Sequence, residues 1–152
     1  MVIKLKIENI MSKDLVVLDI NSLVEQVAKK MKEYDIGFVP ISDNSKIVGV
    51  ITDRDIVTKI IANNDNKIKS YISKNLVKIN INSSIEDAAK LMGEKRIKRL
   101  LVEDNNKLVG IVSLSDILHN INSDIVYENI KKIFEIYRNT DEYLPEINEF
   151  EL

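Results

Sequence analysis

The chain has 152 residues, of which 45% are hydrophobic and 30% are charged, and its formal net charge is -2. This composition is ordinary for a globular protein, and so small a net charge excludes a general electrostatic attraction to nucleic acid or to an anionic membrane. The sequence has no cysteine and one histidine, His119, so disulfides, thiolate nucleophiles and cysteine-ligated zinc are excluded, and we expect no metal site.

Residues 1–9 alternate between apolar and charged side chains, which predicts a short strand. The segment has no long apolar core, so it is predicted to be neither a signal peptide nor a membrane span. We therefore expect a protein of the cytoplasm with no membrane partner.

The next segment predicts a strand over 15–18 and then a helix. Ser22 and Glu25 have the spacing of a capping box, in which the serine oxygen accepts a hydrogen bond from a free backbone amide and the glutamate reaches back. The helix that they open is predicted to bury one face, because its apolar residues recur at helical spacing. That face consists of Val24, Val27, Ala28 and Met31.

Two further strands are predicted over 37–41 and 47–52, with a polar turn at 43–45 between them. A second helix is predicted from Asp53 through Ile61. The predicted order is therefore strand, helix, strand, strand, helix.

The same order begins again after the polar linker at 63–66, at a constant offset of 61 positions. Gly49 returns as Gly110, and Asp55 returns as Asp116. The capping pair and the buried helix face return as Ser83 with Glu86 and as Ile85, Ala88, Ala89 and Met92. Such a repeat indicates two copies of one unit, each too small to bury both faces of its sheet alone, so we expect the copies to pack on each other.

The remaining residues, 123–152, have no counterpart in the first repeat. An apolar stripe predicts a helix, and an acidic tail that we expect to be loosely held follows from Thr140. Because a monomer would leave part of this stripe exposed, we expect a homodimer, and the alternative is that the helix folds back on its own module. The stripe consists of Ile125, Val126, Ile130, Ile133, Phe134 and Tyr137.

Both repeats end in one pattern: a glycine, two apolar residues, a threonine or serine, and an aspartate three residues later. With its strands and helices, this unit resembles the CBS domain, named after cystathionine β-synthase, which normally occurs as a tandem pair. The resemblance implies an α+β fold with α/β-type repeats, in which two CBS domains, 7–62 and 68–121, pack with pseudo-two-fold symmetry. The C-terminal helix and acidic tail at 123–152 lie outside the resemblance.

The resemblance also implies a function. CBS pairs bind adenosine-containing ligands such as AMP, ADP, ATP or S-adenosylmethionine in their clefts and regulate another protein, which this sequence does not identify. We expect an adenine nucleotide as a regulatory ligand, no required cofactor, no catalytic residue and no nucleic acid partner. One departure from the family pattern is that Pro40, in the strand expected to face the ligand, becomes Leu101 in the second copy.

The residue types suit a nucleoside. An ionised aspartate only accepts hydrogen bonds and can take both hydroxyls of a ribose, so Asp55 and Asp116 are the candidate ribose clamps. Thr52 and Ser113 can add a hydroxyl contact near the sugar or phosphate. Gly49 and Gly110 are predicted to allow close approach of the backbone.

Basic residues distinguish the two copies. Arg54 begins the second helix of the first copy and could reach a phosphate, whereas its counterpart is Ser115. Lys98 and Arg99 precede a strand at a point where many CBS domains carry phosphate-binding residues, so we predict a phosphate role for Arg99. Because the first copy is the fuller match to the family, we expect the Asp55 site to bind more tightly.

Two other interpretations remain open. The threonine or serine and aspartate pairs also fit structural capping boxes, and charge runs are usually solvated surface. The alternative function is therefore a structural or dimerisation module with vestigial ligand clefts. An enzyme is a more distant alternative, since no pairing of a base with a nucleophile can be identified.

Overall fold

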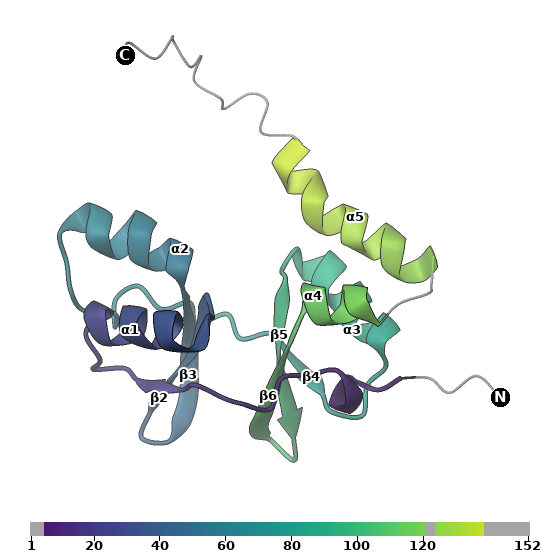
Figure 1. The fold of residues 1–152 in the computed structure, drawn as a ribbon, viewed down its shortest axis with the longest axis horizontal. Coiled ribbons are helices and arrows are strands. Elements are labelled where there is room, and N and C mark those ends of the chain that lie inside the picture. Colours follow the sequence, from purple (N-terminus) through teal and green to yellow (C-terminus); the bar gives the residue numbers. More distant parts are fainter. Residues whose placement is uncertain (1–4, 121–123, 139–152) are drawn as a thin grey trace, which may run out of the picture. The chain divides into compact units, whose positions relative to one another are not determined.

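The computed structural model describes residues 5–120 and 124–138. Within this part the chain forms two compact units. One unit contains residues 13–78, and the other contains residues 5–12 together with the described residues from 79 onward. The predicted fold class is confirmed, because each repeat supplies one three-stranded sheet with helices (Figure 1).

The first repeat follows the predicted order of elements. Its three strands lie in the order β1-β2-β3, with β1 parallel to β2 and β2 antiparallel to β3. Only Leu18–Asp19 pairs as β1, so the strand predicted over 15–18 is mostly absent. The elements are β1 (Leu18–Asp19), α1 (Val24–Tyr34), β2 (Phe38–Asp43), β3 (Lys46–Thr52), α2 (Asp53–Asp55), a π-helical turn (Ile56–Ile60) and a 3-10 turn (Ile61–Asn63).

The second repeat is built in the same way and carries one more helix. Its sheet has the order β4-β5-β6, and α5 packs against α3 within the same unit. The elements are β4 (Lys78–Asn80), α3 (Ile85–Lys95), β5 (Arg99–Asp104), β6 (Lys107–Ser113), α4 (Leu114–His119) and α5 (Asp124–Arg138).

The strand predicted over 1–9 is wrong for its described part. Residues Ile7–Asn9 form a 3-10 turn, and Ile7 N donates to Ser83 O at 2.9 Å. Further on, Ser12 and Ile111 exchange two backbone hydrogen bonds of 2.9 and 3.0 Å. The N-terminal segment therefore satisfies its backbone groups against the second repeat. The predicted domain boundaries, 7–62 and 68–121, stay a prediction, as does the packing symmetry.

The helix starts differ from the prediction by one residue. In the first repeat Leu23 N donates to Gln26 Oε1 at 2.8 Å, so Ser22 and Glu25 do not form the cap. In the second repeat Ser84 and Asp87 form the capping box, in place of Ser83 and Glu86. The two serines predicted as caps, Ser22 and Ser83, each lie directly after the turn that follows the preceding strand.

The buried helix faces differ between the repeats. In α1 the residues Val24, Val27 and Met31 are buried as predicted, but Ala28 is exposed. In α3 all four predicted residues are buried, including Ala89 at the position equivalent to Ala28. The prediction fails at Ala28 because a helix is buried only where another element covers it, and α5 covers α3.

In α5, Val126, Asn129 and Ile133 are buried, while Tyr127 and Phe134 are exposed. The predicted helix is therefore present and turns one face towards α3. The side chains of Ile125 and Tyr137 and the acidic tail lie outside the described residues.

Candidate functional site

The first candidate aspartate lies where β3 ends and α2 begins. The backbone amide of Thr52 donates to Asp55 Oδ2 at 3.0 Å, and the Thr52 hydroxyl donates to the same oxygen at 2.7 Å. In return, Asp55 N donates to Thr52 Oγ1 at 3.1 Å. These bonds close a capping box, which holds the carboxylate in a fixed orientation at the end of the strand.

The second candidate aspartate lies in the same arrangement between β6 and α4. The amide and the hydroxyl of Ser113 both donate to Asp116 Oδ2 at 2.7 Å, and Asp116 N donates to Ser113 Oγ at 3.2 Å. The structural interpretation of both pairs as capping boxes is therefore confirmed. It does not exclude ligand binding, because each box occupies only Oδ2 and leaves Oδ1 outside.

The outer oxygens of the two carboxylates have different neighbours. Lys59 Nζ lies 2.6 Å from Asp55 Oδ1 in an ion pair one helical turn further along. In the part of the chain that the structure describes, Asp116 Oδ1 accepts no hydrogen bond. The residue equivalent to Lys59 is Asn120, whose side-chain amide donates to the backbone oxygen of Asp116 at 2.8 Å.

This difference affects the protonation of Asp55. Desolvation by burial raises its pKa, but the hydrogen bonds from Lys59 and from Thr52 together outweigh it, so the pKa lies below the ordinary value of 3.8. Asp55 is therefore an ionised acceptor near neutral pH. Lys59 is not among the site residues predicted from the sequence, although a lysine four residues after an aspartate on a helix is a recognisable ion-pair spacing.

The two glycines approach protein backbone closely. A Cβ at Gly49 would lie 2.8 Å from Ser73 O, and one at Gly110 would lie 2.8 Å from Ser12 O. Both glycines are thus required where the segment that precedes a repeat crosses a strand. The predicted close approach is confirmed, but the group that approaches each glycine is the protein's own backbone. A ligand contact at either glycine stays a prediction.

The strand residues Pro40 and Leu101 are both buried in the middle strands of their sheets. Their side chains therefore serve the core. A ligand could reach these positions only through the backbone, so their predicted ligand contact remains untested.

The basic residues are placed as follows. Arg99 is exposed and lies opposite Ser113 in the β5–β6 register, which brings it beside the second capping box. Lys98 lies next to it, and its Nζ is 5.1 Å from the centre of the Phe134 ring on α5. Arg54 is exposed directly after the first strand-to-helix junction. Lys98 and Arg99 therefore lie close to the Asp116 box in the same unit, and their predicted contact with a phosphate stays a prediction.

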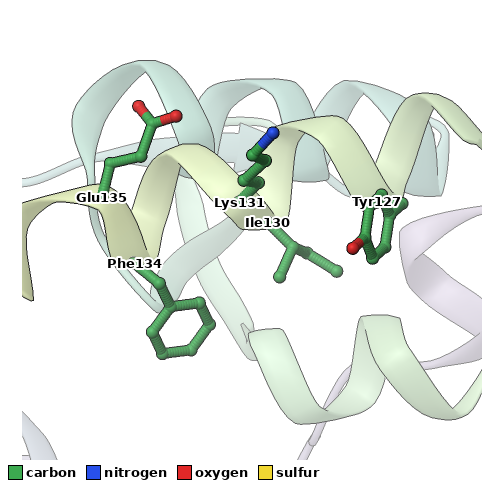
Figure 2. A pocket seen from close by; sticks show the side chains of 5 residues that line it. All are labelled: Tyr127, Ile130, Lys131, Phe134 and Glu135. Carbon is green, nitrogen blue, oxygen red and sulfur yellow. The ribbon is translucent and has the colours of Figure 1, made fainter. Parts of the chain in front are cut away.

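A surface hollow lies on α5. Figure 2 shows the side chains of Tyr127, Ile130 and Phe134 pointing to one side of the helix, with Lys131 and Glu135 completing the lining. None of the candidate ligand residues lines this hollow. It is an amphipathic helix face rather than part of the aspartate sites.

No group of three or more histidine, cysteine or acidic side chains in residues 5–120 and 124–138 is arranged to hold a metal ion. Among the helices of the same ranges, none is both long enough and apolar enough to cross a membrane.

Two sheets of one topology, each ending in a strand-to-helix aspartate box, define a tandem-repeat protein. The chain belongs to the CBS family, since the model of the CBS domain matches residues 7–62 and 68–123. The resemblance noted in the sequence is thereby confirmed. CBS domain pairs are in general regulatory modules without catalytic activity.

Two sequence relatives show in what settings the pair occurs. The CBS domain-containing protein YhcV of Bacillus subtilis is 32% identical over 117 residues, which cover 75% of this chain and 84% of that protein. Inosine-5'-monophosphate dehydrogenase of Methanocaldococcus jannaschii is 35% identical over 115 residues, which cover 74% of this chain but only 23% of the enzyme. Since most of the enzyme has no counterpart here, its activity does not carry over.

A solved structure shows what a similar pair binds. The CBS domain pair of protein MJ0100, in complex with 5'-methylthioadenosine and S-adenosyl-L-methionine, is 27% identical to this chain with a TM-score of 0.71. The match covers 76% of this chain and 94% of that one. A pair with this fold can therefore bind adenosine-containing small molecules.

Proposed function

We propose that this protein is a non-catalytic regulatory module that binds an adenosine-containing ligand and transmits its presence to a partner protein. The observation that supports this most directly is that each repeat fixes one carboxylate at a strand end and leaves its Oδ1 outside the capping box. Ligand binding by the MJ0100 pair supports the same proposal.

The chemistry of the proposed contact is a charge-assisted hydrogen bond. A ribose offers two neighbouring hydroxyls as donors, and an ionised carboxylate held rigidly by its own backbone is a good acceptor for them. Because Thr52 and Ser113 already orient the carboxylates, the ligand would not have to order these side chains on binding.

A phosphate on the ligand would be held by basic side chains, with Arg99 as the main candidate because it lies beside the Asp116 box. Replacing Arg99 with alanine should weaken AMP binding more than adenosine binding, and the difference should shrink at high ionic strength. Equal losses for the two ligands would remove the phosphate role from Arg99.

The remaining parts of the proposal concern assembly and location. A homodimer would cover the exposed aromatic side chains of α5, Tyr127 and Phe134. The regulated partner is a separate protein of unknown identity, and the proposed location is the cytoplasm.

The test is a thermal-shift panel of adenosine, AMP, ADP, ATP, S-adenosylmethionine and cyclic dinucleotides, followed by calorimetry. A ligand at one hundred times its Kd stabilises the native state by about 2.7 kcal/mol, which is a readily measured rise in Tm. The double variant Asp55→Asn, Asp116→Asn should keep its fold and lose the shift. If no ligand of the panel binds the parent protein at millimolar concentration, the proposal fails.

The alternative function, a structural or dimerisation module with vestigial ligand clefts, is also supported by an observation. The capping boxes account for both aspartates without any ligand, and each residue of the pattern then serves the helix start. In that case the panel gives no shift, and light scattering still shows a dimer.

A further inference from the structure

The ion pair between Lys59 and Asp55 has no equivalent in the second repeat. Lys59 Nζ lies 2.6 Å from Asp55 Oδ1, and the two side chains are 55% and 15% exposed respectively. Lys59 can make this contact because the helical segment runs on from Asp53 to Asn63, so residues 55 and 59 lie one turn apart. In the second repeat α4 ends at His119, and Asn120 turns back to the Asp116 backbone oxygen.

The ammonium group and a ribose would compete for one oxygen. Asp55 Oδ2 already accepts two hydrogen bonds from Thr52, so Oδ1 is the oxygen that a ligand would use, and Lys59 holds it. Asp116 is held in the same way by Ser113, but its Oδ1 has no partner among the described residues. The two neighbouring hydroxyls of a ribose could therefore donate to Asp116 Oδ1 directly, whereas at Asp55 they would have to displace Lys59 from Oδ1.

We propose that Lys59 sets the order of affinity of the two sites by acting as an internal competitor at Asp55, so that an uncharged ribonucleoside binds the Asp116 site more tightly. This rests on the proposed function, because it assumes that the aspartates accept ribose hydroxyls. It reverses the order expected from the sequence, in which the fuller family match favoured Asp55.

Ionic strength separates this mechanism from a merely structural role of Lys59. An ion pair with an ammonium as exposed as that of Lys59 weakens in salt. Adenosine carries no charge, so its own contacts respond little to salt. Its affinity at Asp55 should therefore rise with salt concentration, whereas its affinity at Asp116 should stay nearly constant.

The experiment measures adenosine binding by calorimetry at one site at a time. Asp116→Asn isolates the Asp55 site and Asp55→Asn isolates the Asp116 site, because the asparagine carbonyl can still accept from the amide of Thr52 or Ser113 while an amide donor replaces the outer oxygen. Each background is combined with the residue that the other repeat carries, Lys59→Asn in the first case and Asn120→Lys in the second. Thermal unfolding confirms that every variant is folded, and Lys59→Gln repeats the test with a longer side chain.

We expect Lys59→Asn and Lys59→Gln to tighten adenosine binding at the Asp55 site by about two- to fivefold, consistent with the modest strength of exposed ion pairs, and to abolish its salt dependence. Asn120→Lys should weaken adenosine binding at the Asp116 site. Deoxyadenosine, which lacks the 2'-hydroxyl, should bind more weakly than adenosine at both sites.

Several results overturn the inference. If both Lys59 substitutions leave the adenosine affinity unchanged, the inference is overturned. Equal adenosine affinity of the two isolated sites also overturns it. Both results leave the proposed function intact. Loss of all binding in Asp116→Asn that Lys59→Asn does not recover also overturns it. If the parent protein binds no ribonucleoside of the panel, the proposed function fails and this inference fails with it.

Discussion

The two repeats have one plan and differ in what covers their first helix. In the second repeat α5 packs on α3, which buries Ala89 completely and brings a Cβ at Gly93 to within 2.9 Å of the Asn129 backbone. In the first repeat the equivalent residues, Ala28 and Lys32, are exposed. The comparison shows that one amphipathic pattern serves a helix with one covered face and a helix with two.

The largest expected effect comes from one substitution made at equivalent positions of the two helices. Ala89→Asp places a carboxylate without a partner between α3 and α5, which should cost about 3 kcal/mol or more, whereas Ala28→Asp should cost less than about 1 kcal/mol. Urea denaturation of both variants measures the difference. Equal losses would mean that the two helices are covered to the same extent.

The glycines on the outer strands should behave alike in both repeats. Gly49→Ala and Gly110→Ala each bring a Cβ to 2.8 Å from a backbone oxygen, so either the crossing segment or the strand must shift. Overpacking of this kind costs about 1–3 kcal/mol, and we expect similar losses at the two sites by chemical denaturation. A loss at only one glycine would show that the two crossings are not equivalent.

The start of α3 gives a smaller effect and tests the position of its cap. Ser84 accepts from Asp87 N at 3.1 Å, so Ser84→Ala should destabilise the protein by about 1 kcal/mol. Ser83→Ala is the matched control and should change the free energy of unfolding by less than about 0.5 kcal/mol. A larger loss for Ser83→Ala than for Ser84→Ala would show that Ser83 is the cap, as expected from the sequence.

The smallest expected effect is a change in how stability depends on pH. It compares Asp55 in the parent protein with Asp55 in a variant that lacks Lys59. The pKa of Asp55 in the folded state is lower than its ordinary value of 3.8, so its contribution to stability is present above that pH and is lost as the pH falls through the folded-state pKa. Lys59→Asn should reduce this contribution by about 0.5 kcal/mol at most, because the lysine is exposed. NMR titration of the Asp55 carboxyl carbon should show its pKa rising in the variant, and an unchanged pKa would contradict the ion pair in solution.

Much of the candidate site could be predicted from the sequence because it is local. Thr52 and Asp55 lie three residues apart at a strand-to-helix junction, and this is the spacing of a capping box when the threonine is the residue that precedes the helix. At α3 the adjacent serines Ser83 and Ser84 both fit the pattern, and the structure uses Ser84. At α1 Ser22 and Glu25 have the spacing, but the helix begins one residue later, at Leu23 with Gln26. The ion pair of Lys59 was also within reach of the sequence, because it depends only on helical spacing.

The sequence by itself determined the repeat, its order of strands and helices, and the aspartate at each strand end, because these follow from periodicity and from contacts between residues a few positions apart. Only the tertiary structure decided that the N-terminal segment pairs with the second repeat, that the glycines make room for crossing backbone, and that α5 buries Ala89. Those outcomes depend on which segments, far apart in the chain, pack against a given strand edge or helix face. Local propensity does not determine which segment takes that position.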